Sequence, residues 1–510
     1  MRLRLACVYW ILVALGCLIL PAVAGAADGR DMPLVFAHFM HCYVRGAIVT
    51  GVPDKGAPAR SPLLEAWPDR SQESQWFAPD LPGDGIEAIR DDFKMAQDAG
   101  LDAMGMILGP KMLPRSQYSG GLNMVATTAS EAEVKLIPEL WGDPWSEDYT
   151  KFGRDIKDFM DAHPNAFLTR NGKPIIIFAF DSSQMFRAHA PVDSALPFID
   201  AFLAPWGGRD KVYIGVYVPY DLMPGLLSPL VAAANAVAVW TPEDDWSALH
   251  SGVVFEIGKR KQKDVMFPIA PAFYQRRAGG APMEYGNAFG AARYIDAWQR
   301  AIRNRPPFID IQTWNDFSED TQIMPSNTSG DTRLRLTRYF TQWFKTGAEP
   351  PVEEERVLLF HPKQLATARL DDPTALSTNA AWRHHSPTVD YIDVVTWLKS
   401  PATLRVTVGQ RAWEQAVPAG FHEWVIYAPQ STQPPPRKGE ALERPDSYPW
   451  PNSRRSVTIA PQFSAAIPEL RVSRDGGVVS TLVSRCAFVD HGAFQDFTVI
   501  GDDALIGEVR

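Results

Sequence analysis

Residues 308–325 read Phe308-Ile-Asp-Ile-Gln-Thr-Trp-Asn-Asp-Phe-Ser-Glu-Asp-Thr-Gln-Ile-Met-Pro325, a short apolar run that leads directly into a polar segment. The apolar part, 308–313, is the last of eight β-rich runs between residues 33 and 316. The other seven are 34–40, 103–108, 134–139, 174–180, 212–218, 236–240 and 265–270. Amphipathic helical patterns separate many of them, at about 84–99, 147–163, 193–204, 249–263 and 289–304. Eight strands joined by helical crossovers predict an α/β fold, a (β/α)8 TIM barrel.

The sequence changes character after Pro350-Pro351, where strand-like runs follow one another without helices. These runs are 357–360, 391–398, 402–408 and 424–427, and they predict a C-terminal β-sandwich. We therefore expect a barrel over residues 27–350 and an accessory β-sandwich domain over 351–510. The proline-rich stretch between residues 433 and 451 is expected to form an exposed loop.

The N-terminus has the layout of a secretory signal peptide. Arg2 and Arg4 precede an apolar run to about Leu20, and Ala24-Gly-Ala26 offers small residues for cleavage. We expect residues 1–26 to be removed and the mature protein to be exported, periplasmic or extracellular, with no membrane attachment after cleavage. Cleavage leaves Cys42 and Cys486, which either stay as two thiols or form one bridge.

Composition narrows the class of partner. The formal charge of −9 and the absence of a long basic run argue against nucleic acid. The chain has no C-x-x-C or H-E-x-x-H pattern, so nothing in it predicts a metal site, and no cofactor is expected. Its 16 tryptophans and 14 tyrosines suit stacking on sugar rings as well as core packing. Oligomeric state is left open.

A barrel builds its active site from the loops at the C-terminal ends of its strands. Polar and aromatic residues recur just after the predicted strands, and we take them as candidates for sugar binding. They are His38, Glu139, Trp141, Asp181, Trp240, Glu243, Tyr274, Trp314 and Asn315. Each of them also has an ordinary explanation as a packing, turn or capping residue.

Asp316 and Glu319 are the candidate catalytic residues. Hydrolysis of a glycosidic bond needs one carboxylic acid to protonate the departing oxygen and one carboxylate to activate water or attack carbon. The alternative is that Asp316 caps a helix and Glu319 closes a capping box. A catalytic acid must keep its proton near neutral pH, and the charges of Asp316, Asp320 and Asp181 are candidates to raise its pKa.

Three segments together resemble glycoside hydrolase family 71, the endo-α-1,3-glucanases or mutanases. They are Val35-Phe-Ala-His-Phe-Met40, Trp314-Asn-Asp-Phe-Ser-Glu319 and Pro401-Ala-Thr-Leu-Arg-Val-Thr-Val408. The resemblance implies a (β/α)8 barrel with an appended β-sandwich, a polysaccharide substrate and inversion at the anomeric carbon. It makes Asp316 and Glu319 the acid pair. By analogy with a related W-N-E-x-x-E segment, Glu319 is the general acid and Asp316 the base, with the reverse order open.

The chain also departs from the family pattern. His41-Cys-Tyr-Val44 follows the first strand, Ser318 replaces a usual glycine, and Asp320-Thr-Gln-Ile323 stands where Ser-His-Tyr-Ile is common. The whole run Trp314-Asn-Asp-Phe-Ser-Glu-Asp-Thr-Gln-Ile323 also looks like the W-N-E-W-H-E-G-T-Q-I segment of family 99 endo-α-mannosidases. An endo-α-mannosidase-like hydrolase and a non-catalytic carbohydrate-binding protein on the same fold therefore remain alternatives.

Overall fold

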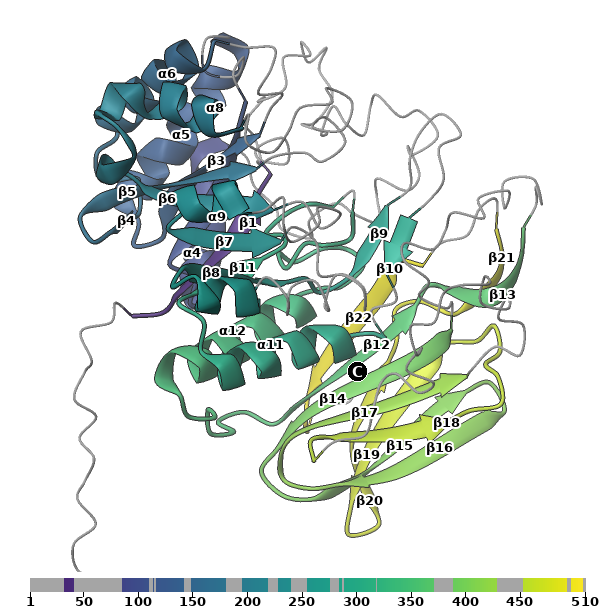
Figure 1. The fold of residues 1–510 in the computed structure, drawn as a ribbon. Helices are drawn as coiled ribbons and strands as arrows, with labels where there is room; N and C mark the ends of the chain where they lie inside the picture. The colour runs from purple at the N-terminus through teal and green to yellow at the C-terminus, as the bar shows by residue number, and fades with distance from the viewer. Residues whose placement is uncertain are drawn as a thin grey trace, which may run out of the picture. The chain divides into compact units, whose positions relative to one another are not determined.

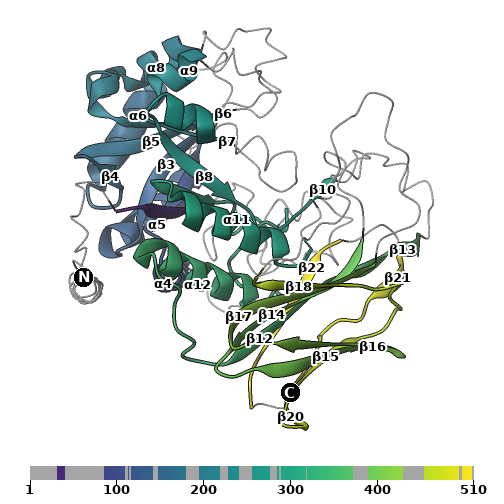
Figure 2. The same cartoon turned by 60° about the horizontal axis from the view of Figure 1, so that its bottom comes forward.

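The computed structural model describes residues 32–40, 85–109, 113, 116–141, 148–179, 195–218, 228–239, 255–275, 284–286, 289–317, 319–370, 389–428, 453–492 and 497–507. These elements belong to one compact unit, Pro33–Arg510. Figures 1 and 2 show a barrel surrounded by helices and, next to it, stacked β-sheets formed by the C-terminal part of the chain.

Eight parallel strands close into the barrel. In sequence order they are β1 (Leu34–Phe39), β2 (Ala103–Leu108), β3 (Lys135–Trp141), β5 (Lys173–Ala179), β6 (Tyr213–Val218), β7 (Ala236–Val239), β8 (Asp264–Ile269) and β11 (Phe308–Ile311). Each pairs with its neighbours, β1 pairs with β11, and β3 pairs directly with β5. The two-residue β4 (Thr169–Arg170) pairs antiparallel with the start of β5. The eight predicted strands and the (β/α)8 barrel are therefore confirmed.

The helices that cover the barrel are partly those predicted. Four predicted helices are present as α4 (Gly85–Asp98), α6 (Tyr149–Ala162), α8 (Ala195–Leu203) and α11 (Ala292–Asn304), and residues 255–260 of the fifth are helical. Gly100 ends α4 with a φ of 83°, and the N–H of Leu101 bonds to Ala96 O at 3.0 Å, as expected of a helix C-terminus.

Three further helices were not predicted: α5 (Ser116–Glu131), α9 (Ser228–Ala233) and α12 (Thr332–Thr346). Helix α5 contains two adjacent glycines and several small polar residues, which have low helix propensity. It forms because Leu122, Val125, Ala126 and Ala129 share one face that is buried in the barrel core. Tertiary packing thus overrides local propensity in this segment.

The C-terminal part forms two main sheets. One has five strands in the order β18 (Arg455–Ile459), β17 (Gly420–Ala428), β14 (Asp390–Leu398), β12 (Arg356–Pro362) and β22 (Val499–Leu505). The other has four, in the order β16 (Arg411–Val417), β15 (Ala402–Val408), β19 (Pro468–Arg474) and β20 (Gly477–Val483). Side chains from both sheets share one apolar core, which agrees with the predicted β-sandwich.

The five-stranded sheet is buried on both faces. Its second face packs on the barrel helix α12, where the ring of Tyr339 stacks on Phe421 with centroids 5.3 Å apart. All nine residues of β14 are buried as a result. The buried Arg455 on β18 links the same sheet to α11, since its guanidinium bonds to Asp296 at 2.9 Å and to the Glu423 carboxylate at 2.6 Å. The sheet therefore braces the barrel. Separately, β9 (Phe273–Gln275) and β10 (Glu284–Gly286) pair as a short hairpin that follows β8.

Candidate active site

The interior of the barrel changes from apolar to polar along its axis. Side chains alternate along each strand, so every second residue faces inward. Phe36, Ile137, Ile177, Met266 and Phe308 fill the lower layers. The uppermost inward positions instead hold four buried polar side chains, which come from β1, β3, β6 and β11. They are His38, Glu139, Tyr217 and Asp310, and we refer to them as the polar floor of the barrel.

Direct contacts connect three members of the polar floor. His38 Nδ1 pairs with Glu139 Oε2, and the Tyr217 hydroxyl donates to Glu139 Oε1 at 3.2 Å. The ring of Trp141 meets His38 edge-on, with centroids 5.8 Å apart. Gly105 on β2 leaves room for the carboxylate, because a Cβ atom there would lie 2.0 Å from Glu139 Oε1. The predicted candidates His38, Glu139 and Trp141 are thus brought together.

Asp310 is the fourth member, and its carboxyl has an unusual protonation behaviour. Burial and, next, the charge of Glu139 raise its pKa to about 7. Burial together with Asp310 and Glu139 also raises the pKa of the Tyr217 hydroxyl well above its usual value. Sequence reasoning missed both residues because they lie inside predicted strands. The available signal was an acidic residue in the otherwise apolar Phe308-Ile-Asp-Ile311, which alternation points inward.

The loop after β11 is tied to itself by hydrogen bonds. The N–H of Thr313 donates to Thr321 O at 2.9 Å, and the N–H of Ile323 donates to Thr313 O at 3.0 Å. The Thr313 hydroxyl accepts the N–H of Asp316 at 2.8 Å. Residues 313–317 and 319–325 form no helix, and α12 begins only at Thr332. Asp316 is therefore not the N-cap of a helix, which removes the capping alternative.

A buried ion pair fixes the second half of this loop. Arg333 on α12 bonds to the Asp320 carboxylate at 2.9 Å and donates to the main-chain oxygens of Asp320 and Gln322 at 2.8 and 3.0 Å. The same carboxylate accepts the N–H of Val499 at 3.1 Å. The charge of Asp320 is therefore compensated by Arg333, which differs from the expectation that it raises the pKa of the catalytic acid.

The C-terminal sheet supports the loop at further points. The N–H of Gly501 in β22 donates to Thr328 O at 2.8 Å, and the Arg485 guanidinium donates to Asn327 O at 3.2 Å. Tyr274 packs edge-on against Phe497, with centroids 6.4 Å apart, and its N–H donates to Glu319 O at 2.8 Å. The segment that carries Asp316 and Glu319 is thus held by the barrel on one side and by the β-sandwich on the other.

The two acidic candidates differ in exposure. Asp316 is 5% exposed, whereas Glu319 is half-buried. Both follow β11 at the C-terminal end of the barrel, as the sequence predicts. A half-buried carboxyl can meet a substrate, and a nearly buried one is shielded from bulk water.

Two of the predicted aromatic platforms are in the core. Trp314 is fully buried in the main hydrophobic cluster, and Tyr274 is 4% exposed. A platform for a sugar ring needs an open face, so the structure corrects both assignments to packing roles. Trp141 is half-buried and stays a candidate sugar-binding residue. Asp181, Trp240 and Glu243 lie outside the described residues, and their roles stay predictions.

Asn315 joins the first and last strand ends of the barrel. Its side-chain oxygen accepts the N–H of Met40 at 2.7 Å, and its amide nitrogen donates to Met40 O at 3.1 Å. The N–H of Trp314 donates to His38 O at 2.7 Å beside it. The fully buried amide therefore acts on the main chain after β1, whereas we had expected it to bind a sugar hydroxyl.

We expect Asn315→Ala to lower kcat about 10- to 100-fold with a smaller change in KM, because the residue before Asp316 would lose its anchor while the sugar-binding surface stays. Steady-state kinetics on a soluble oligosaccharide would measure both constants. Asn327→Ala in the same loop is the matched control, and an equal loss there would contradict a specific role for the Asn315 amide.

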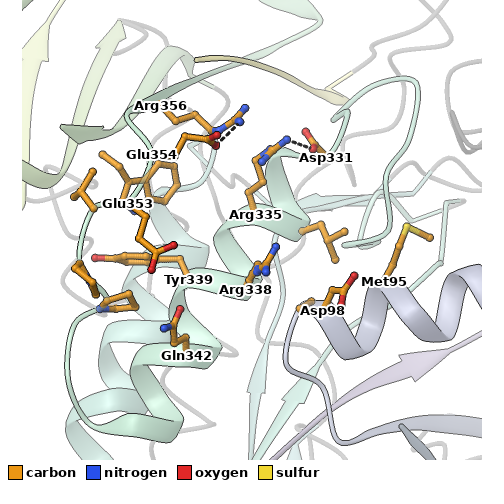
Figure 3. Close-up of a pocket in the computed structure, with 16 residues that line it drawn as sticks. Met95, Asp98, Asp331, Arg335, Arg338, Tyr339, Gln342, Glu353, Glu354 and Arg356 are labelled. Atoms are coloured by element: carbon orange, nitrogen blue, oxygen red, sulfur yellow. Dashed lines mark hydrogen bonds and ion pairs between the residues drawn. The ribbon is translucent and has the colours of Figure 1, made fainter. Parts of the chain in front are cut away.

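Figure 3 shows a cleft of about 430 Å³ between α4, α12 and residues 350–356. It lies on the outside of the barrel and is lined by residues such as Asp98, Arg338 and Glu353. None of the predicted site residues lines it. The polar floor and the loop after β11 therefore stay the candidate active site.

Within the described ranges, no group of three or more His, Cys, Asp or Glu side chains is arranged to hold a metal ion. No described helix is long and apolar enough to cross a membrane. Cys486 is half-buried, and Cys42 lies outside the described residues, so the pairing of these two cysteines stays open.

A closed (β/α)8 barrel whose last strand leads into two neighbouring carboxylic acids is an arrangement used by glycoside hydrolases. The model of glycosyl hydrolase family 71 matches residues 85–430, which is more than half of the chain. The chain therefore belongs to glycosyl hydrolase family 71, and it is a member of a family of glycoside hydrolases.

A curated relative is the ascus wall endo-1,3-alpha-glucanase of Schizosaccharomyces pombe (strain 972 / ATCC 24843), 23% identical over 175 residues. The match covers 31% of this chain and 39% of the length of that relative. Among solved structures, the GH99 endo-alpha-mannosidase from Bacteroides thetaiotaomicron is similar, at 15% identity and a TM-score of 0.45 over 61% of this chain and 97% of that chain. Its complex with bis-tris-propane gives 16% identity and a TM-score of 0.47 over the same shares.

Proposed function

We propose that this protein hydrolyses α-1,3-glucosidic bonds inside a polysaccharide, with Asp316 and Glu319 as its catalytic pair and with inversion at the anomeric carbon. The observation that carries the proposal is the match to glycosyl hydrolase family 71 over residues 85–430, a range that contains the loop with both acids. The curated relative named as an endo-1,3-alpha-glucanase supports the choice of linkage.

In the proposed reaction, Glu319 donates its proton to the glycosidic oxygen as the bond from that oxygen to the anomeric carbon breaks. Asp316 removes a proton from a water molecule that attacks the same carbon from the opposite face. One proton enters the leaving group and one leaves the water, so Glu319 ends ionised and Asp316 ends protonated. Proton exchange with solvent then restores the starting state.

Anchoring of the loop supports a catalytic role for the pair. Hydrogen bonds from Thr313, Asn315 and Tyr274 fix the main chain on both sides of the pair. A loop held at several points loses little freedom when substrate binds, which favours a productive geometry of acid and water. Export of the mature protein, proposed from its N-terminal sequence, would bring it to a polysaccharide outside the cell.

The test is hydrolysis by the purified protein, measured as new reducing ends. Insoluble α-1,3-glucan, an α-1,4-glucan and an α-mannan oligosaccharide would be compared at equal sugar concentration. We expect oligosaccharides from α-1,3-glucan alone. Release from the mannan alone would replace the glucanase proposal by an endo-α-mannosidase. The segment Thr321-Gln-Ile323, which resembles the family 99 sequence, is the observation that favours this alternative. Binding to α-1,3-glucan without release would indicate a carbohydrate-binding protein.

A further inference from the structure

The two carboxyl oxygens of Asp310 have different surroundings. Oδ2 accepts a hydrogen bond from Gln312 Nε2 at 3.2 Å. Oδ1 is buried and has no hydrogen-bond partner in the described part of the chain. A buried carboxylate with few hydrogen-bond donors is strongly disfavoured by desolvation, whereas a neutral carboxylic acid avoids most of that penalty. The surroundings of Asp310 therefore favour its neutral form.

Tyr217 gives a second reason. Its hydroxyl lies 3.2 Å from Glu139 Oε1 and also interacts with the Asp310 carboxyl, but it has a single proton to share between the two acids. Glu139 also contacts His38 Nδ1, so its carboxyl has two polar partners in the polar floor. No cationic side chain in the described part of the chain is in direct contact with Asp310, and two buried carboxylates next to one hydroxyl would repel each other.

We propose that Asp310 is a positioning residue that carries a proton in the active enzyme, and that its neutral form preserves the contact between Glu139 and His38 and keeps the candidate catalytic loop in place. This inference deepens the proposed function and rests on it for its activity measurements.

Two chains of contacts lead from Asp310 to the catalytic loop. The first passes through the Tyr217 hydroxyl, which interacts with both acids, to Glu139 and then to His38. The main-chain oxygen of His38 accepts the N–H of Trp314 at 2.7 Å. The second runs along β11 itself, since Gln312 bonds to Asp310 and lies four residues before Asp316. A negative charge on Asp310 would disturb Glu139 and the strand end of β1, and so would move Asp316.

The pH dependence follows from the charged groups at this level of the barrel. Among the residues that the structure describes, the titratable groups that face Asp310 are His38 from β1, Glu139 from β3 and Tyr217 from β6. At the corresponding positions β2, β5, β7 and β8 carry Gly105, Ala179, Ala238 and Pro268, which do not titrate. Loss of the Asp310 proton as the pH rises through its pKa of about 7 is therefore not offset by another group, and activity should fall there.

The decisive variant is Asp310→Asn, which keeps the shape and stays neutral at every pH. On α-1,3-glucan we expect it to retain activity within a few-fold of wild type at pH 5.5 and to move the alkaline limb of the kcat/KM profile upward by about one pH unit or more. Glu139→Gln should lose activity about 100-fold at all pH values, because the charge that holds His38 is gone. An Asp310→Asn enzyme that is about 100-fold slower throughout, or whose alkaline limb does not move, would overturn the proposal.

Thermal unfolding without substrate tests the protonation state independently of activity. The folded-state pKa of Asp310 is raised above the unfolded value, so the contribution of this group to stability is fully present below about pH 4 and is lost as the pH rises through about 7. Asp310→Asn lacks this loss and should gain a few degrees in Tm over wild type between pH 5 and pH 8. A constant difference would overturn the proton assignment even if the substrate proposed above proves wrong.

Gly105→Ala tests the link through Glu139 without touching a titrating group. The added methyl would collide with Glu139 Oε1, and we expect a loss of activity of about 10- to 100-fold. Gly215→Ala is the matched control, because it lies in the barrel interior on β6, where a Cβ would meet the side chains of Ile177 and Met266. Equal losses in the two variants would contradict a specific role for the Glu139 position.

Discussion

Glu319→Gln and Asp316→Asn are each expected to lower kcat on α-1,3-glucan by about 10²- to 10⁴-fold, with Tm changed by less than a degree or two. The loss reflects removal of the proton donor in one variant and of the base in the other, and proton transfer of this kind contributes about that much to a rate. Both changes keep side-chain volume, so the loop should keep its fold. Reducing-end release under saturating substrate would measure the effect.

The two variants should differ when the leaving group needs no proton. On an α-1,3-linked glucobiosyl fluoride, Glu319→Gln should recover most of the wild-type rate, because departure of fluoride depends little on the acid. Asp316→Asn should stay slow, because attack by water still needs the base. The opposite pattern would reverse the two roles. Glu353→Gln, an exposed acid on the surface cleft, is the control and should behave as wild type.

Arg333→Met is expected to lower the free energy of unfolding by about 3–5 kcal/mol, the cost of leaving one charge of a buried ion pair without its partner. Arg333 is almost fully buried, and it bonds to the Asp320 carboxylate and to two main-chain oxygens of the catalytic loop. Denaturant unfolding would measure the loss. Activity should fall as well, by about 10-fold or more, because the loop loses its anchor on α12.

Arg338→Met on the same helix is the matched control. Arg338 is exposed and has no hydrogen bond or ion pair with any described residue, so its replacement should change stability by less than about 0.5 kcal/mol. The double variant Arg333→Met with Asp320→Asn should recover part of the stability, since it leaves no unpaired charge. Equal effects of the two arginine changes would contradict the account of the loop.

The barrel was predictable from sequence because each of its strands is a short β-rich run buried on both faces. Runs such as Pro174–Phe180 and Phe308–Thr313 need no partner to be recognised. Helix α5 was not predictable in the same way. Its helical state depends on burial of Leu122 and Val125 against strands that are remote in sequence, while its own residues favour helix weakly.

The candidate site likewise contains some residues that the sequence identifies and others whose role only the fold reveals. Asp316 and Glu319 stand out in a polar motif, whereas the roles of Trp314 and Asn315 depend on what surrounds them. A tryptophan beside an acid pair suits a sugar platform, but the loop folds back on itself and buries this ring. An asparagine in the same motif is suited to bind a sugar hydroxyl, but the Asn315 side chain is already hydrogen-bonded to the main chain of Met40 after β1. Contacts between distant strands are what a motif leaves unspecified.

Arg333 is a further residue whose role could not be predicted from the sequence. Nothing in Thr332-Arg-Leu-Arg335 marks one arginine as buried and the other as partly exposed. Only the fold shows that α12 presents Arg333 to the loop and that Val499, far along the chain, joins the same carboxylate. The β-sandwich, whose runs were recognised from sequence, thereby gains a defined contact with the catalytic segment.

The measurement that tests the central claim most directly is a proton NMR time course of a soluble α-1,3-gluco-oligosaccharide mixed with the wild-type protein. The anomeric signals report both cleavage of this linkage and the configuration of the first product. The account predicts that the β-anomer of the new reducing end appears first and then equilibrates with the α-anomer. An α-anomer that appears first would contradict inversion, and an unchanged spectrum would contradict the proposed substrate.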